Sequence, residues 1–184
     1  MLTHPLRGKT PVLGFAAASG TGKTTLLREV IPRLRRAGVR PGLIKHTHHD
    51  FEMDEPGKDS FELRKAGASP VLIASHRRRG IFFEHEHPRE PVLAEELACL
   101  EPLALDLILV EGFRHERFPK IELSRRALDA PHLFVSDPSI IALATDGVPP
   151  ADIQIPVLDL NDPDAVSHYI LEVFMPEARH VVGL

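Results

Sequence analysis

The chain has 184 residues, of which 43% are hydrophobic, and this is enough apolar material for the core of one domain of ordinary size. Its formal net charge of −4 provides no overall attraction for nucleic acid, so we expect no nucleic-acid partner. The single cysteine, Cys99, excludes an intrachain disulfide and favours a reducing, cytoplasmic setting. The longest apolar stretch, residues 103–110, is interrupted by Asp106, so we expect a soluble protein without membrane contact.

The first predicted elements are a strand, a tight loop and a helix within residues 11–37. Residues 12–16 form a short apolar run, and apolar residues recur at helical spacing after Lys23. In this setting, backbone N–H groups can curl around a phosphate at the amino end of the helix. The residues predicted to bind a nucleoside triphosphate are Ser19, Gly20, Thr21, Gly22, Lys23, Thr24 and Thr25. Pro32 lies inside the helical pattern, where we expect a kink or a break.

Two residues of this loop have predicted chemical roles. Lys23 is expected to reach the terminal phosphates and to act as a catalytic residue, while the Thr24 hydroxyl is a candidate ligand of Mg²⁺. The usual phosphate-loop pattern has glycine where this chain has Ala17. The alternative interpretation is therefore a glycine-rich turn with an incidental Gly-Lys-Thr sequence.

The rest of the chain alternates strands and helices. The expected strands are residues 42–47, 70–75, 81–86, 103–112, 119–125, 132–136, 139–146 and 155–160, and the expected helices are residues 59–67, 92–100 and 162–174. A basic turn at 77–80 joins two of the strands into a hairpin, and residues 1–10 and 176–184 are expected to fray. Asp59 or Ser60 is the expected cap of the helix that begins near them. The order predicts an α/β, P-loop NTPase-like fold, with a mainly parallel sheet flanked by helices and a β-hairpin insert, in a single domain over 1–184.

Acidic residues at two strand ends are candidates for the same site. Glu111 ends a nearly continuous apolar strand, where it can hold Mg²⁺ through water or position a water beside the terminal phosphate. Asp146 ends a later strand, where its carboxylate can accept the two donors of a guanine base. No Asn-Lys-x-Asp sequence occurs, and the alternative for Asp146 is a simple turn residue before Gly147.

Three histidines follow the second strand. His46 and His48 could form a zinc or nickel site with Asp50 or Glu52, which would make the protein a metal-delivery GTPase. The other interpretation is a switch loop that rearranges on hydrolysis. In it, Lys45 or one of the three histidines, His46, His48 or His49, contacts phosphate, and Asp50 or Asp59 contacts Mg²⁺. We favour the switch because no cysteine pair supplements the histidines.

Several blocks of the sequence closely resemble the molybdopterin-guanine dinucleotide biosynthesis adapter (MobB) family. They are FAAASGTGKTTLL, RPGLIKHTHHDFEMDEPGKDSFELRKAGA, LDLILVEGFRHERFPKIEL and IALATD. The resemblance implies a homodimeric protein that binds GTP and Mg²⁺, with weak GTPase activity. It would act beside the molybdopterin guanylyltransferase, which joins GMP to molybdopterin, and beside the molybdenum insertion protein. By position, residues 20–25 would hold the phosphates and Mg²⁺, Glu111 would be the second acidic residue of the site, and Asp146 would lie near the base.

The sequence therefore favours a cytoplasmic GTP-binding adapter that assists the attachment of GMP to molybdopterin. Two other classes stay open, a P-loop kinase of small molecules and the histidine-rich metal-delivery GTPase. Two basic clusters, residues 77–79 and 114–120, could bind a phosphorylated ligand or the acidic face of a partner.

Overall fold

The computed structural model describes residues 10–47 and 51–182. Its internal contacts divide the chain into two compact units. The first, here called the sheet unit, consists of Met1–His46 and Val92–Leu184, and the second, the hairpin unit, consists of Thr47–Pro91. That the whole chain acts as one nucleotide-binding domain stays a prediction.

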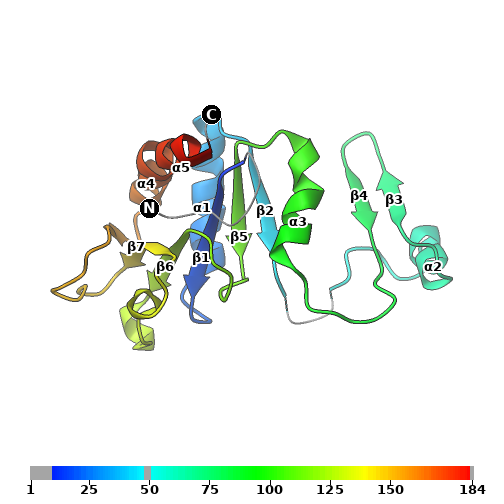
Figure 1. Ribbon diagram of the computed structural model, residues 1–184. Helices are drawn as coiled ribbons and strands as arrows, with labels where there is room; N and C mark the ends of the chain where they lie inside the picture. The colour runs from blue at the N-terminus through cyan, green and yellow to red at the C-terminus, as the bar shows by residue number, and fades with distance from the viewer. Residues whose placement is uncertain (1–9, 48–50, 183–184) are drawn as a thin grey trace. The chain divides into compact units, whose positions relative to one another are not determined.

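The sheet unit contains six strands in the order β2-β5-β1-β6-β7-β8. They are β1 (Val12–Ala17), β2 (Pro41–Lys45), β5 (Leu107–Glu111), β6 (Lys120–Ser124), β7 (Ile140–Thr145) and β8 (Val157–Asp159). Every neighbouring pair is parallel, so the carboxyl ends of all six strands lie along one edge (Figure 1). The predicted parallel sheet is confirmed, and its carboxyl edge is where ligands bind in open α/β sheets.

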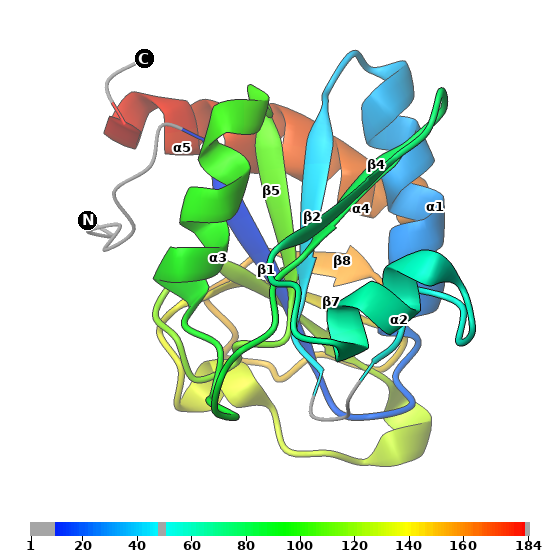
Figure 2. The same ribbon diagram turned by 90° about the vertical axis from the view of Figure 1, so that its right-hand side faces the viewer.

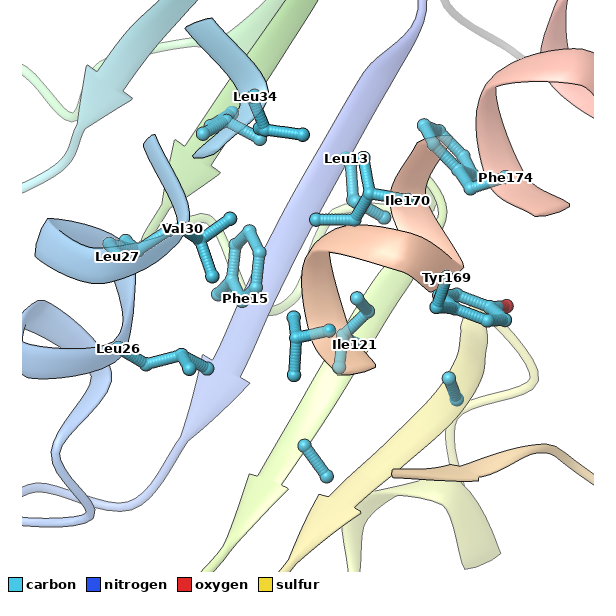
Figure 3. Close-up of a cluster of buried hydrophobic side chains, with 14 of the residues drawn as sticks. Leu13, Phe15, Leu26, Leu27, Val30, Leu34, Ile121, Tyr169, Ile170 and Phe174 are labelled. Carbon is cyan, nitrogen blue, oxygen red and sulfur yellow. The ribbon is translucent and has the colours of Figure 1, made fainter. Parts of the chain in front are cut away.

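Alternating side chains give the sheet two separate apolar faces. Leu13 and Phe15 of β1 pack on α1 (Lys23–Arg36), α4 (Pro163–Tyr169) and the π-helical turn η4 (Ile170–Phe174), as Figure 3 shows. On the other face, Val12 of β1 and Ile108 and Val110 of β5 pack on α3 (Leu93–Leu100). In Figure 2, α1 and α3 lie on opposite sides of β1, β2 and β5. Helices on both faces explain why these strands are almost continuously hydrophobic.

Two expectations about the sheet unit were wrong. Residues 132–136 form the 3₁₀ turn η3 (Leu133–Val135) instead of a strand, because the buried Glu122 carboxylate accepts hydrogen bonds from the N–H groups of Leu133 and Phe134. Residues 176–182 belong to helix α5 (Met175–Val182), whose Met175 and Ala178 are buried, so the predicted fraying does not hold for these residues, while residues 183–184 lie outside the described part of the chain. Of the expected kink or break at Pro32, the break does not occur, because α1 runs through Pro32 with Val30 and Leu34 buried on both sides, and a kink stays a prediction.

The hairpin unit contains helix α2 (Asp59–Lys65) and strands β3 (Val71–Ala74) and β4 (Arg79–Phe82). The strands are antiparallel, which confirms the predicted hairpin, although Arg79 and Gly80 belong to β4 and not to the turn. Capping of α2 by Asp59 or Ser60 was wrong, because its cap position is Lys58 and has no side-chain hydrogen bond. No helix among the described residues combines the length and the apolar character that crossing a membrane requires.

Candidate functional site

The phosphate-loop candidate joins β1 to α1 at the carboxyl edge of the sheet. Gly20 and Gly22 have φ angles of +81° and +98°, which is the left-handed region that glycine adopts readily. Gly22 is the cap residue of α1, and no side chain caps the helix there. The first N–H groups of a helix lack partners within the helix, so this end of α1 can accept an anion.

Ala17, where the usual loop pattern has glycine, lies in regular strand backbone. It is the last residue of β1 and pairs with Leu123 of β6. Among the described residues, positive φ angles outside glycine occur at Ala104, Phe113 and Asp129, so Ala17 does not need the left-handed region. The departure from the pattern therefore costs the loop no backbone strain.

The loop side chains differ in exposure. Ser19 and Gly20 are exposed, as are Thr24 and Thr25 in the first turn of α1, while Lys23 is partly buried. Thr21 is buried, and its hydroxyl donates to the Ala18 carbonyl at 2.8 Å, a bond that braces the loop from inside. The exposed hydroxyl of Thr24 suits the predicted contact with a cation.

Glu111 lies at the end of β5, between the ends of β1 and β2. Its carboxylate is 3.5 Å from the Lys45 ammonium, and its carbonyl accepts a hydrogen bond from the His46 N–H at 2.8 Å. Gly112 follows with φ +102°, and a Cβ atom there would lie 2.6 Å from the His46 Cβ. The His46 ring packs against Phe113, with 4.9 Å between ring centroids. The structure thus brings Lys45, His46 and Glu111 together beside the phosphate loop.

The rest of the histidine block is only partly covered by the structure. His48, His49 and Asp50 lie outside the described residues. Within the described residues, no group of three or more histidine, cysteine, aspartate or glutamate side chains could hold a metal ion. Asp59 lies in the first turn of α2 and belongs to the hairpin unit, whereas the other described candidates belong to the sheet unit, and its contact with Mg²⁺ stays a prediction.

Asp146 is held by two neighbours at the end of β7. One carboxylate oxygen accepts the Arg126 N–H at 2.8 Å, and the other accepts Arg125 Nη1 at 2.8 Å. The N–H of Arg126 and the charge of Arg125 hold the pKa of Asp146 below its ordinary value, so its carboxylate stays ionised.

Arg125 reaches the phosphate loop from the same position. Its Nε donates to the Thr21 carbonyl at 2.9 Å. No motif in the sequence predicted a role for Arg125. The only signal for it was an arginine directly after a strand, and its meaning depends on β6 lying between β1 and β7, which the sequence does not show.

A pocket of about 270 Å³ opens beside the loop. It is lined by Ala17, Ala18 and Thr21 of the loop, by Arg114, and by the end of β6 with the segment that follows it. Its walls are mostly apolar, and Arg114 and Arg125 supply the cationic groups. The carboxyl edge of the sheet therefore offers more space than the phosphate loop alone.

One member of the predicted basic cluster 114–120 is structural. Lys120 is only 1% exposed, and its ammonium lies 3.0 Å from the Asp137 carboxylate. Partial burial acts to raise the pKa of Asp137, but hydrogen bonds from the Ser139 N–H and Lys120 outweigh it, so the pKa is lowered. Lys120 is therefore not part of an exposed basic cluster, because its ammonium pairs with Asp137 after β6 and donates to the Arg114 and Glu116 carbonyls after β5.

Comparison with known proteins gives a consistent result. Residues 12–146 match the family described as molybdopterin guanine dinucleotide synthesis protein B, MobB. The chain is 47% identical over 170 residues to the molybdopterin-guanine dinucleotide biosynthesis adapter protein of Escherichia coli, covering 91% of this chain and 96% of that one. It is 37% identical to the Haemophilus influenzae adapter protein, covering 90% of each. A crystal structure of a MobB homolog from Bacillus stearothermophilus superposes with a TM-score of 0.65 at 26% identity, covering 92% and 98%. The P-loop NTPase-like fold predicted from the sequence is confirmed.

Proposed function

Because this chain belongs to the MobB family and is an adapter protein of molybdopterin-guanine dinucleotide biosynthesis, we propose that it works by binding GTP and Mg²⁺. The nucleotide would lie at the carboxyl edge of the sheet unit. The observation that carries this proposal is the phosphate loop, in which two glycines have positive φ angles and no side chain caps the start of α1. Hydrogen bonds of Arg125 connect this loop to the carboxylate of Asp146. This arrangement supports a phosphate subsite and a base subsite at one edge of the same sheet.

The phosphate subsite is assigned to residues 19–25. Backbone N–H groups of the loop would surround the phosphates, and Lys23 would bind the terminal ones. The Thr24 hydroxyl would ligate Mg²⁺, with Glu111 holding it through water and Asp59 as a further candidate ligand. When bound, Mg²⁺ supplies positive charge that offsets the negative charge of the phosphates.

The base subsite is assigned to Asp146. Guanine presents its ring N–H and its exocyclic amine side by side, and one ionised carboxylate can accept from both. Adenine has no such pair of donors, so it would leave the carboxylate unmatched. The lowered pKa of Asp146 supports this role, because a protonated carboxyl would have one acceptor fewer.

Hydrolysis of GTP is proposed to be weak. Lys23 can stabilise charge on the transferred phosphoryl group, and Glu111 can position a water. Neither residue provides the combined water orientation and arginine contact that fast phosphoryl transfer uses. A multiple-turnover rate above about 1 s⁻¹ for the isolated protein would contradict an adapter role, because dedicated enzymes work in that range.

The partners follow from the adapter role. We propose that the protein acts in the cytoplasm beside the molybdopterin guanylyltransferase and the molybdenum insertion protein, as a homodimer. The exposed apolar face of the hairpin unit supports a second copy as partner: Leu72 and Ile81 are opposite each other on β3 and β4, and they are 58% and 50% exposed. A two-stranded sheet is marginally stable alone, so covering this face would stabilise it.

Calorimetric titration with GTP and ATP in the presence of Mg²⁺ tests the nucleotide assignment. The expected result is preference for GTP, with binding lost in Lys23→Ala and retained in Arg28→Ala, which removes the same charge from an exposed position of α1. Asp146→Asn should shift the preference from GTP to XTP, because the amide presents a donor to the additional carbonyl of xanthine. Preference for ATP would favour the small-molecule kinase, and no binding of either nucleotide would refute the assignment of the loop.

A further inference from the structure

Arg125 connects the two proposed subsites. Its Nε donates to the Thr21 carbonyl inside the phosphate loop, at 2.9 Å. Its Nη1 donates to Asp146 at 2.8 Å and, more weakly, to the Asn161 side chain at 3.4 Å. One guanidinium thus joins the phosphate loop, the end of β7 and the segment after β8.

The Arg125 guanidinium also lies close to Gly22, the final glycine of the loop. A Cβ atom added at Gly22 would lie 3.5 Å from Arg125 Nη2, so the guanidinium lies against the backbone at the start of α1. The Arg125 side chain is 32% exposed and that of Asp146 is 21% exposed. Exposed ion pairs contribute little to stability, but the Arg125 guanidinium is held in place by a backbone carbonyl as well as by a carboxylate.

Resting on the proposed function, we infer that Arg125 is a positioning residue that couples the phosphate loop to the base-reading carboxylate. The planar guanidinium donates in two directions at once, so the position of the loop and the orientation of Asp146 depend on each other. Ordering of the loop by the triphosphate therefore favours the carboxylate orientation that accepts guanine.

The Asp146 carboxylate retains the acceptor capacity for this role. Each oxygen of an ionised carboxylate can accept about two hydrogen bonds. One on each oxygen is used, by Arg126 N–H and by Arg125, which leaves one on each oxygen for guanine. Because both existing donors come from the β6 end, they also fix the direction in which the remaining acceptors point.

The inference predicts a change in nucleotide selectivity beyond any general weakening of binding. In Arg125→Ala, the affinity for GTP should fall about tenfold or more, because Asp146 loses one of the two hydrogen bonds that orient it toward the base, while affinity for inorganic tripolyphosphate changes much less. The ratio of GTP to ITP affinity should fall as well, because ITP lacks the exocyclic amine that Asp146 accepts. Arg125→Lys should not restore this ratio, since an ammonium cannot donate to both partners in the geometry of the fork.

The experiment measures GTP, ITP, ATP and tripolyphosphate binding by calorimetry for the wild type, Arg125→Ala, Arg125→Lys, Asp146→Ala and the double variant. Arg28→Ala serves as the control for loss of one positive charge, and thermal unfolding confirms that each variant is folded. Non-additive effects of Arg125→Ala and Asp146→Ala on GTP affinity, absent for tripolyphosphate, are the expected result.

Several results would overturn the inference. An unchanged ratio of GTP to ITP affinity in Arg125→Ala, or full rescue by Arg125→Lys, would show that Arg125 does not couple the subsites. An equal loss of tripolyphosphate affinity would show that it supports the phosphate loop alone. If the wild type itself did not prefer GTP, the proposed function would fail and the inference would fail with it; preference for GTP with additive variants would remove the inference alone.

Discussion

The sheet unit and the hairpin unit are stabilised in different ways. In the sheet unit, Leu13, Leu109 and Ile121 are fully buried, and helices cover both faces of the strands. Among the described residues of the hairpin unit, the buried side chain is Arg64, which pairs with Glu52 and Glu84. The difference separates a well-packed frame, which can position a nucleotide site, from a unit whose exposed apolar surface we propose as the contact with a second copy.

The largest expected effect is the loss of a core side chain behind the phosphate loop. Phe15→Ala removes a ring that is 2% exposed on β1, two residues before the strand ends, and should lower the free energy of unfolding by about 3–5 kcal/mol. Leu72→Ala, on the exposed face of β3, is the matched apolar truncation and should cost far less in dilute protein. Urea unfolding of both variants would measure the difference. Equal losses would contradict the distinction between the units.

The next effect concerns the buried cation of the sheet unit. Lys120→Met leaves the Asp137 carboxylate without its ammonium partner and should cost about 3 kcal/mol of unfolding free energy, as loss of one partner of a buried pair does. Replacing Asp137 by alanine in the same chain should recover part of the loss.

In Arg64→Met, by contrast, faster hydrogen exchange should be confined to residues 59–84, because Glu52 and Glu84 are partly solvated. Global destabilisation by Arg64→Met would show that the two units unfold together.

The fold could be predicted from local patterns wherever one signal dominated. The phosphate loop, the continuous apolar run of β5 and the hairpin were all found in this way. Predictions of secondary structure failed where a side chain distant in the sequence stabilises another conformation. The apolar segment 132–136 forms the turn η3 because its N–H groups donate to the Glu122 carboxylate. The predicted site residues Lys23, Glu111 and Asp146 all lie at one sheet edge. Arg125 could not be found because its partners, Thr21 and Asp146, become neighbours only through strand order.

A smaller effect is expected at the proposed dimer face. Leu72, Ile81 and Phe83 alternate onto the exposed side of the hairpin, whereas Val71 and Phe82 on the other side are half-buried. Ile81→Glu should weaken self-association about tenfold or more, because it places a charge in an apolar contact. Sedimentation over a range of protein concentrations would measure this, with Glu95→Lys on α3 as a charge-changing control. Unchanged association in Ile81→Glu would assign the dimer to another surface.

The smallest effect is a pH dependence confined to the core of the sheet unit. Burial raises the pKa of Tyr169 from 10.0 to about 12, and its hydroxyl donates to the Ile141 carbonyl. A raised pKa in the folded state means that this contribution to stability is complete below pH 10.0 and is lost as the pH rises toward 12. Since the chain has one tyrosine and no tryptophan, near-ultraviolet absorbance reports the ionisation of Tyr169 directly. Tyr169→Phe should make the unfolding midpoint in urea less dependent on pH over this range. Titration of Tyr169 at the ordinary tyrosine pKa in the folded protein would mean that solvent reaches this part of the core. The sheet unit would then be less closed than the burial of its side chains indicates, and its contrast with the hairpin unit would be weaker.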